Sequence, residues 1–182
     1  MIYTQHYDSP LGGILLAADD IGLTGLWFEG QKYFARTLDA VHQEQETAVL
    51  SEARRWLDVY FGGQEPDFPP PLHPAGSAFQ QEVWALLRQI PYGETTTYRA
   101  LAEAVARKRG LRRMSAQAVG GAVGHNPISI IIPCHRVVFK DGGLCGGLAF
   151  GGEGIQRALL EEEGVVFLPD GRVDMARCGW LK

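Results

Sequence analysis

Apolar residues along the chain first follow the spacing of strands and then the spacing of a helix. Residues 3–7, 13–18 and 25–28 form short apolar or alternating runs, and turn-forming Gly, Pro, Asp and Ser residues separate them. Residues 50–61 then place apolar side chains three or four positions apart, which puts them on one face of a helix. The N-terminal part therefore predicts a β-meander followed by a helix.

Three further helical patterns occupy the middle of the chain. Residues 77–90 begin with a capping serine, residues 98–106 follow capping threonines, and residues 116–124 follow Ser115. The connection at 107–113 is basic. Two short helices joined by a basic turn and followed by a strand have the layout of a winged helix-turn-helix.

The third of these helices has a poor helix-forming composition, because three of the nine residues from 116 to 124 are glycine. Each glycine costs up to ~1 kcal/mol relative to alanine in a helix. Such a helix needs a reason for its glycines. One reason is tight packing against a neighbour, and the other is close approach of a DNA backbone.

An apolar, β-branched run at residues 130–138 surrounds Pro133 and Cys134. Branching at Cβ favours extended chain, and proline cannot donate to a sheet, so the run predicts a strand that ends or bulges at Pro133. Cys134 is then expected at the mouth of this buried strand. A glycine-rich loop at 142–154 and a helix at 155–163 follow.

Prolines mark the boundary between two domains, since five of the nine residues from 66 to 74 are proline. The predicted fold class is α+β, and Cys134 belongs to the second domain. The predicted parts are a sheet-and-helix domain over 1–65, a linker over 66–76, a winged helix-turn-helix domain over 77–164, and a short hairpin or loose tail over 165–182.

The net charge of −4 conceals an uneven distribution of charge. Residues 1–72 contain 4 Lys or Arg against 11 Asp or Glu, whereas residues 85–140 contain 9 Lys or Arg against 2 acidic residues. A polyanion such as DNA is attracted to the second stretch and repelled by the first. An ordinary basic surface is the alternative explanation.

The cysteine count and the N-terminus predict a cytoplasmic protein. Three cysteines without regular spacing indicate no disulfide framework and fit a reducing compartment. No signal peptide is apparent, and no apolar run approaches the ~20 residues of a membrane-spanning helix. His6 and His42 have no cysteine or second histidine at metal-ligand spacing, so neither a metal nor another cofactor is predicted.

His135 and Arg136 change the interpretation of Cys134. A free cysteine is most simply a small buried apolar side chain. An adjacent base and positive charge, however, lower a thiol pKa towards the range in which the nucleophilic thiolate is populated. The local sequence therefore leaves a structural thiol and a nucleophile as alternatives.

Several motifs, taken in order, resemble the O6-alkylguanine-DNA alkyltransferases, strongly over 77–164 and more weakly before. They are Tyr98, Gln-Ala-Val-Gly-Gly-Ala at 117–122, Asn-Pro at 126–127, Pro-Cys-His-Arg-Val at 133–137 and Leu-Leu-Glu-Glu-Glu-Gly at 159–164. The resemblance implies a ribonuclease-H-like N-terminal domain. It also implies irreversible, single-turnover transfer of an alkyl group from O6-alkylguanine, flipped out of duplex DNA, to a protein cysteine.

The resemblance implies a role for each catalytic residue. Cys134 is the nucleophile and methyl acceptor, His135 is a base that acts through a water, and Glu163 orients His135. Tyr98 donates a proton to the departing guanine and crowds the phosphate. Asn126 ties the recognition helix to the active-site strand.

The resemblance also implies which residues contact double-stranded DNA and which line the guanine pocket. Gln117 stands where most of the family has an arginine finger, so it can wedge and hydrogen-bond but lacks the charge. The expected DNA contacts are Ser115, Ala116, Gln117, Ala118, Gly120, Gly121, Thr96, Arg99 and Arg136. The expected pocket residues are Val137, Val138, Phe150 and Gly151.

The pocket loop departs from the family's Gly-Tyr-x-Gly-Gly pattern. At 145–152 the tyrosine is missing and about three residues are added, so Phe150 is expected to supply the ring. A non-catalytic alkylguanine-binding protein, a cysteine hydrolase and a plain winged-helix DNA-binding protein with a structural cysteine remain as alternatives. The resemblance predicts a monomer and leaves open cooperative binding to DNA, the range of alkyl groups and repair of O4-alkylthymine.

Overall fold

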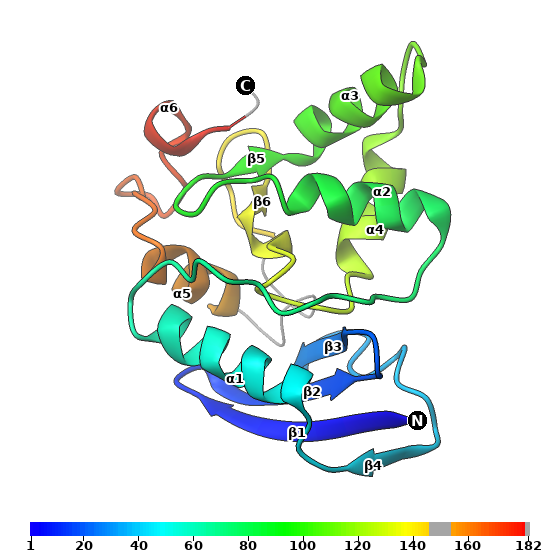
Figure 1. The fold of residues 1–182 in the computed structure, drawn as a ribbon. Helices are drawn as coiled ribbons and strands as arrows, with labels where there is room; N and C mark the ends of the chain where they lie inside the picture. The colour runs from blue at the N-terminus through cyan, green and yellow to red at the C-terminus, as the bar shows by residue number, and fades with distance from the viewer. Residues whose placement is uncertain (146–153, 181–182) are drawn as a thin grey trace.

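The computed structural model describes residues 1–145 and 154–180, which form two domains (Figure 1). The N-terminal domain is a four-stranded sheet in the order β3-β2-β1-β4, in which β4 is parallel to β1 and the other pairs are antiparallel. The strands are β1 (Ile2–Ser9), β2 (Gly12–Ala18), β3 (Leu23–Phe28) and β4 (His42–Glu44). The predicted meander is confirmed. The sequence pattern does not predict β4, because its three residues are all polar and exposed.

Helix α1 (Ala48–Phe61) covers the face of the sheet that is turned toward the C-terminal domain (Figure 1). Thr47 caps the helix by accepting a hydrogen bond from the backbone N–H of Leu50. The buried side of α1 includes Leu57 and Tyr60. The predicted helix is confirmed, and its buried side places Tyr60 within reach of the second domain.

Helices α2 to α4 are present in the C-terminal domain, as predicted, together with a two-stranded parallel sheet whose first strand the sequence pattern did not predict. Each helix begins at its predicted cap: Ser77 shares a capping box with Gln80, and Thr97 and Ser115 accept backbone hydrogen bonds. The elements are α2 (Ala78–Leu87), β5 (Thr96–Thr97), α3 (Tyr98–Arg109), α4 (Ala116–Gly124), β6 (Val137–Val138), α5 (Ile155–Glu162) and α6 (Met175–Cys178).

The proline-rich segment lies along β3 and joins the two domains. The Leu23 N–H donates to the carbonyl of Pro71 at 2.8 Å, and the His73 N–H donates to the carbonyl of Leu23 at 2.7 Å. One apolar cluster contains Leu57 of the first domain together with Leu101 of the second. The domains therefore share a core, which fixes α1 against the C-terminal domain.

The expected strand over 130–138 is wrong except for β6. Ile130 has a φ of +69°, and Cys134–Arg136 form a 3-10 turn. The Asn126 side chain folds this segment, since its oxygen accepts from the Ile128 N–H at 3.0 Å and its nitrogen donates to the Ile132 carbonyl at 2.8 Å. The β-branched residues before Cys134 therefore contribute to the apolar core and do not pair in a sheet.

The chain after α5 packs on the rest of the C-terminal domain. Phe167 and Val173 form an antiparallel bridge around a turn, and α6 follows. The Thr95 N–H donates to the Cys178 carbonyl at 2.7 Å, and the Trp180 N–H donates to the Thr95 carbonyl at 2.6 Å. This segment thus supports the residues that lead into Tyr98. In the described part of the chain, no helix is long and apolar enough to cross a membrane.

Substitution of Gly142 tests whether this residue packs closely against Val173 of the C-terminal segment. Its φ is +87°, and a Cβ there would lie 2.4 Å from the carbonyl oxygen of Val173. We expect Gly142→Ala to lower the free energy of unfolding by more than the roughly 1–2 kcal/mol that a left-handed residue costs by itself. Urea unfolding measures this. Gly12→Ala is the control, because Gly12 has a φ of +117° and nothing within 4 Å; equal losses in both variants would contradict the contact.

Candidate active site and nucleic-acid interface

Cys134 lies in the 3-10 turn and is 6% exposed. Burial raises the pKa of its thiol to about 11, against the opposing effect of a hydrogen bond from the Asn126 side chain. The expectation that its neighbours lower the thiol pKa is therefore wrong. A thiol with this pKa is protonated at neutral pH, so it needs a base to become a nucleophile.

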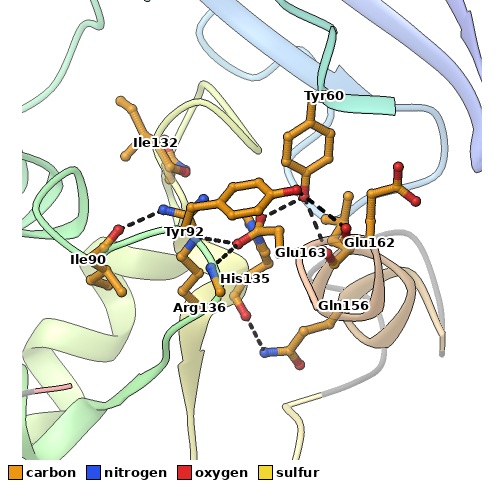
Figure 2. A network of polar contacts seen from close by, with 12 residues as sticks. Tyr60, Ile90, Tyr92, Ile132, His135, Arg136, Gln156, Glu162 and Glu163 are labelled. Carbon is orange, nitrogen blue, oxygen red and sulfur yellow. Dashed lines mark hydrogen bonds and ion pairs between the residues drawn. The ribbon is translucent and has the colours of Figure 1, made fainter. Parts of the chain in front are cut away.

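His135 is placed to be that base. Its Nε2 lies 2.5 Å from Oε2 of Glu163, and its Nδ1 is buried without a hydrogen-bond partner among the described residues (Figure 2). Because an ionised carboxylate only accepts hydrogen bonds, Nε2 carries the proton and Nδ1 holds a free lone pair. Burial lowers the pKa of His135 and outweighs the attraction of Glu163, so the imidazole is neutral and able to take up a proton.

Glu163 follows α5 and accepts hydrogen bonds from three further groups. The hydroxyl of Tyr60 donates to Oε2 at 2.7 Å, Nε of Arg136 donates to Oε1 at 2.7 Å, and the N–H of Gly93 donates to Oε1 at 3.3 Å. Burial by itself would raise the pKa of this carboxyl, but His135 and Arg136 lower it to about 2. Glu163 is therefore a permanent anion that stabilises a positive charge on His135.

Arg136 serves the structure of the site. Its Nη1 donates to the carbonyl of Ile90 at 2.6 Å, its Nε is bonded to Glu163, and its guanidinium lies 5.7 Å from the centre of the Tyr92 ring (Figure 2). Thr96 is fully buried. Neither residue is on the exposed surface with the other expected DNA contacts, so neither belongs to the DNA interface proposed below.

Tyr98, at the start of α3, is close enough to Cys134 for the two side chains to interact electrostatically. Its hydroxyl lies 2.8 Å from Sγ of Cys145. Burial raises the pKa of Tyr98, and the nearby thiols of Cys145 and Cys134 raise it further. The hydroxyl therefore remains protonated and has a proton to donate; its expected role toward guanine stays a prediction.

Gln156 is a site residue that the sequence pattern did not indicate. Its side-chain nitrogen donates to the carbonyls of His135 at 3.1 Å and Val137 at 2.9 Å, and its oxygen accepts from the Cys145 N–H at 2.9 Å. Gln156 thus joins the Cys134 turn to the segment beside Tyr98. Its helical position predicts burial, but nothing in the local sequence identifies these partners.

The expected DNA contacts on α4 form one exposed surface. Ser115, Ala116, Gln117, Ala118 and Gly121 are exposed, and Gly120 is half-buried. Beside them, a hollow of about 450 Å³ between α3 and α4 is lined by four arginines: Arg99, Arg107, Arg112 and Arg113. Cationic side chains around a helix start offer contacts to phosphate groups.

The glycines of α4 carry no side chains that would project from this surface. A Cβ at Gly121 or Gly124 would meet nothing within 4 Å, and a Cβ at Gly120 would make an ordinary contact of 3.6 Å with the Tyr98 ring. Packing inside the protein therefore does not require these glycines. Of the two reasons considered from the sequence, close approach of a DNA backbone is the one that the structure favours.

The structure covers only part of the expected guanine pocket. Val137 and Val138 are fully buried, whereas Phe150 and Gly151 lie outside the described residues. Among the residues that are described, no group of three or more His, Cys, Asp or Glu is placed to hold a metal ion.

Comparisons with known proteins match both domains. The model of the 6-O-methylguanine DNA methyltransferase ribonuclease-like domain matches residues 2–74, and that of the DNA binding domain matches residues 78–165. A methylated-DNA–protein-cysteine methyltransferase of Haemophilus influenzae is 40% identical over 173 residues, which are 93% of this chain and 90% of that protein.

Solved structures give the same result. Mycobacterium tuberculosis OGT in complex with DNA aligns with a TM-score of 0.74 at 38% identity, covering 88% of this chain and 92% of that one. The O6-methylguanine methyltransferase of the same organism aligns with a TM-score of 0.73 at 40% identity, covering 90% and 93% of the two chains.

Gly121→Ala separates the two explanations for the glycine-rich helix. Because a Cβ there meets no atom, we expect a gain of up to ~1 kcal/mol in the free energy of unfolding from the higher helix propensity of alanine. If a DNA backbone lies against the helix, the same methyl group weakens DNA binding. Thermal unfolding and a fluorescence binding titration measure the two effects. A variant that is more stable and binds DNA equally well would contradict close approach at this position.

Glu163→Gln tests the buried ion pair. We expect a loss of about 3–5 kcal/mol at neutral pH, because Arg136 is left buried without its anion. The pKa of Glu163 is lowered from 4.5 to about 2, so its stabilising effect is present above pH 4.5 and is lost as the pH falls toward 2. Over that interval the stability of the variant should therefore fall less steeply than that of the wild type in urea unfolding.

Glu161→Gln is the matched control for this comparison. Glu161 is 53% exposed and pairs with Arg157 on the surface of α5. An exposed pair of this kind is worth about 0–1 kcal/mol. If the two variants lose the same stability and keep the same pH dependence, the assignment of Glu163 as a buried anion is wrong.

Proposed function

The chain belongs to the 6-O-methylguanine DNA methyltransferase family, and on this basis we propose that it repairs DNA by moving an alkyl group from O6 of guanine to Cys134. The observation that carries the proposal is the arrangement of Cys134, His135 and Glu163. A buried thiol precedes an imidazole whose Nδ1 has no hydrogen-bond partner among the described residues and whose Nε2 is held by a carboxylate. This arrangement supports activation of the thiol by a base.

Duplex DNA binds against α4 and the arginines around it. Exposed small residues let the helix approach the backbone, and the basic hollow attracts phosphates without reading sequence. The O6 atom is reached only after the base leaves the stack, which costs a few kcal/mol and least for a poorly paired lesion. Gln117, exposed on α4, is placed to occupy the space that the base vacates.

The transfer is a displacement at the alkyl carbon. The Cys134 proton passes through a water to Nδ1 of His135, and the sulfur forms a bond to the carbon. The bond between that carbon and O6 breaks, its electrons remain on guanine, and Tyr98 donates the proton that neutralises the base. The imidazolium formed on His135 then returns its proton through solvent to Tyr98, so both residues end neutral. Glu163 stabilises the imidazolium formed on His135. No cofactor enters this balance.

The product is a thioether on Cys134, which this reaction does not reverse. Each molecule therefore acts once, and the protein is consumed in proportion to the damage repaired. Burial of Cys134 suits such an acceptor, because a protonated, enclosed thiol reacts slowly with other electrophiles.

We also propose that the protein works in the cytoplasm. Cys134, Cys145 and Cys178 are all free thiols, which is the state expected in a reducing compartment. A monomer is sufficient for the reaction, since all the catalytic groups proposed here come from one chain.

The mass of the protein after incubation with DNA tests the proposal directly. With a duplex containing O6-methylguanine, we expect the mass gain of one methyl group on a peptide that contains Cys134, at no more than one equivalent per molecule. Cys134→Ser should bind the lesion in a gel-shift assay without transferring the group. Repeated turnover, or methyl transfer by the serine variant, would overturn the assignment.

A further inference from the structure

The hydroxyl of Tyr60 reaches from the N-terminal domain into the catalytic network. Tyr60 lies on α1 and is fully buried. Its hydroxyl is 2.7 Å from Oε2 of Glu163, the same oxygen that lies 2.5 Å from Nε2 of His135 (Figure 2). A second contact at 3.3 Å joins the hydroxyl to the carbonyl of Leu159. Two donors from different domains therefore meet on one carboxylate oxygen.

We propose that Tyr60 is a positioning residue for alkyl transfer, because its hydrogen bond to Glu163 limits how strongly the carboxylate favours a proton on His135. The inference rests on the proposed function, in which neutral His135 takes the proton of Cys134. It assigns to the N-terminal domain a direct effect on the chemistry of the C-terminal domain.

The shared oxygen is the physical basis of this effect. The hydrogen bond from Tyr60 draws negative charge from Oε2 and thereby weakens its attraction for a positively charged imidazole. Burial and the neighbouring Glu163 raise the pKa of Tyr60 itself, so its hydroxyl donates and does not ionise. Tyr60 is thus a fixed donor. Among the described residues, Oε2 has one other partner, His135, and His135 is the one that gains a proton in the proposed transfer.

Aromatic packing fixes the Tyr60 ring. The ring stacks on Trp56 with centroids 5.4 Å apart. It also forms T-shaped pairs with Phe61 and Tyr92, with centroids 5.2 Å and 6.3 Å apart. Because the ring is packed on three sides, moving its hydroxyl away from Glu163 would disrupt these contacts. The donor is therefore already in place before substrate binds.

The other charged and titratable groups around His135 act from different directions. Arg136 is bonded to the opposite oxygen, Oε1, and its positive charge lowers the pKa of His135. Cys134 precedes His135 in the turn, and the Tyr92 hydroxyl donates to the backbone carbonyl of Glu162 at 3.3 Å rather than to the carboxylate. Tyr60 is therefore the side chain whose removal changes Oε2 with the least change elsewhere.

Tyr60→Phe in the full-length protein tests the inference. Without the hydroxyl, Glu163 attracts the proton on His135 more strongly, so the pKa of His135 rises. Transfer requires neutral His135. As the pH is lowered, the single-turnover rate of the variant should therefore begin to fall at a higher pH than that of the wild type. We expect the half-maximal pH on the acid side to rise by about one unit, with the rate at high pH within about twofold of the wild type.

Tyr7→Phe is the matched control. Its hydroxyl donates to Asp58 of α1 at 2.6 Å and does not touch Glu163. The Tyr7→Phe substitution should leave the half-maximal pH of the transfer rate unchanged. A role for Tyr60 in packing alone would lower the rate equally at all pH values, or only the stability, and would not move this midpoint; that result would overturn the inference.

Site-specific replacement of Tyr60 by 3-fluorotyrosine gives a change of opposite sign. The more acidic phenol donates more strongly to Glu163, so the half-maximal pH should fall. This variant keeps the ring and hydroxyl, so it also tests the inference if Tyr60→Phe does not fold. An unchanged midpoint would count against Tyr60 even if the variant remains active.

The ring nitrogens of 15N-labelled His135, observed by NMR in the free protein, provide a readout that does not depend on transfer. Protonation of His135 should occur at higher pH in Tyr60→Phe and at lower pH in the fluorotyrosine protein. If these shifts occur but the wild type transfers no methyl group, the proposed function fails while the coupling stands. If the wild type transfers and neither substitution shifts His135, the inference is wrong.

Discussion

The buried carboxylate of Glu163 is the constraint on which the active site depends. An ion in the interior is tolerated only when it is paired and hydrogen-bonded, and Glu163 meets this requirement with donors from Tyr60, Gly93, His135 and Arg136. These donors come from α1, the turn before β5 and the 3-10 turn. Satisfying one anion therefore fixes three parts of the chain relative to α5 (Figure 2).

The reactivity of Cys134 comes from this organisation and not from a low thiol pKa. The positive charge two positions further along the chain, Arg136, is directed at Glu163 and Ile90. Burial instead keeps the proton on sulfur, and in the proposed mechanism His135 removes it. A thiol that is activated only together with its substrate suits an acceptor that can be used once.

The two domains differ in charge and in what they contribute to the site. The N-terminal domain is acidic and contributes packing and the Tyr60 hydroxyl, whereas the arginines around α3 and α4 form the basic surface. The glycines of α4 cost helix stability and fill no tight contact inside the protein, which supports the proposed binding of DNA against this helix.

Local spacing in the sequence determined most of the secondary structure, because apolar periodicity and caps such as Ser77, Thr97 and Ser115 act over a few residues. The order of motifs around Cys134 was enough to identify the family and to name Tyr98, Asn126, His135 and Glu163 as candidates. The tertiary structure alone decided that residues 130–136 form turns, that Arg136 points inward, and that Tyr60 and Gln156 join the site. These features depend on hydrogen bonds between residues as far as 103 positions apart, and no local pattern in the sequence records which distant groups will meet when the core closes.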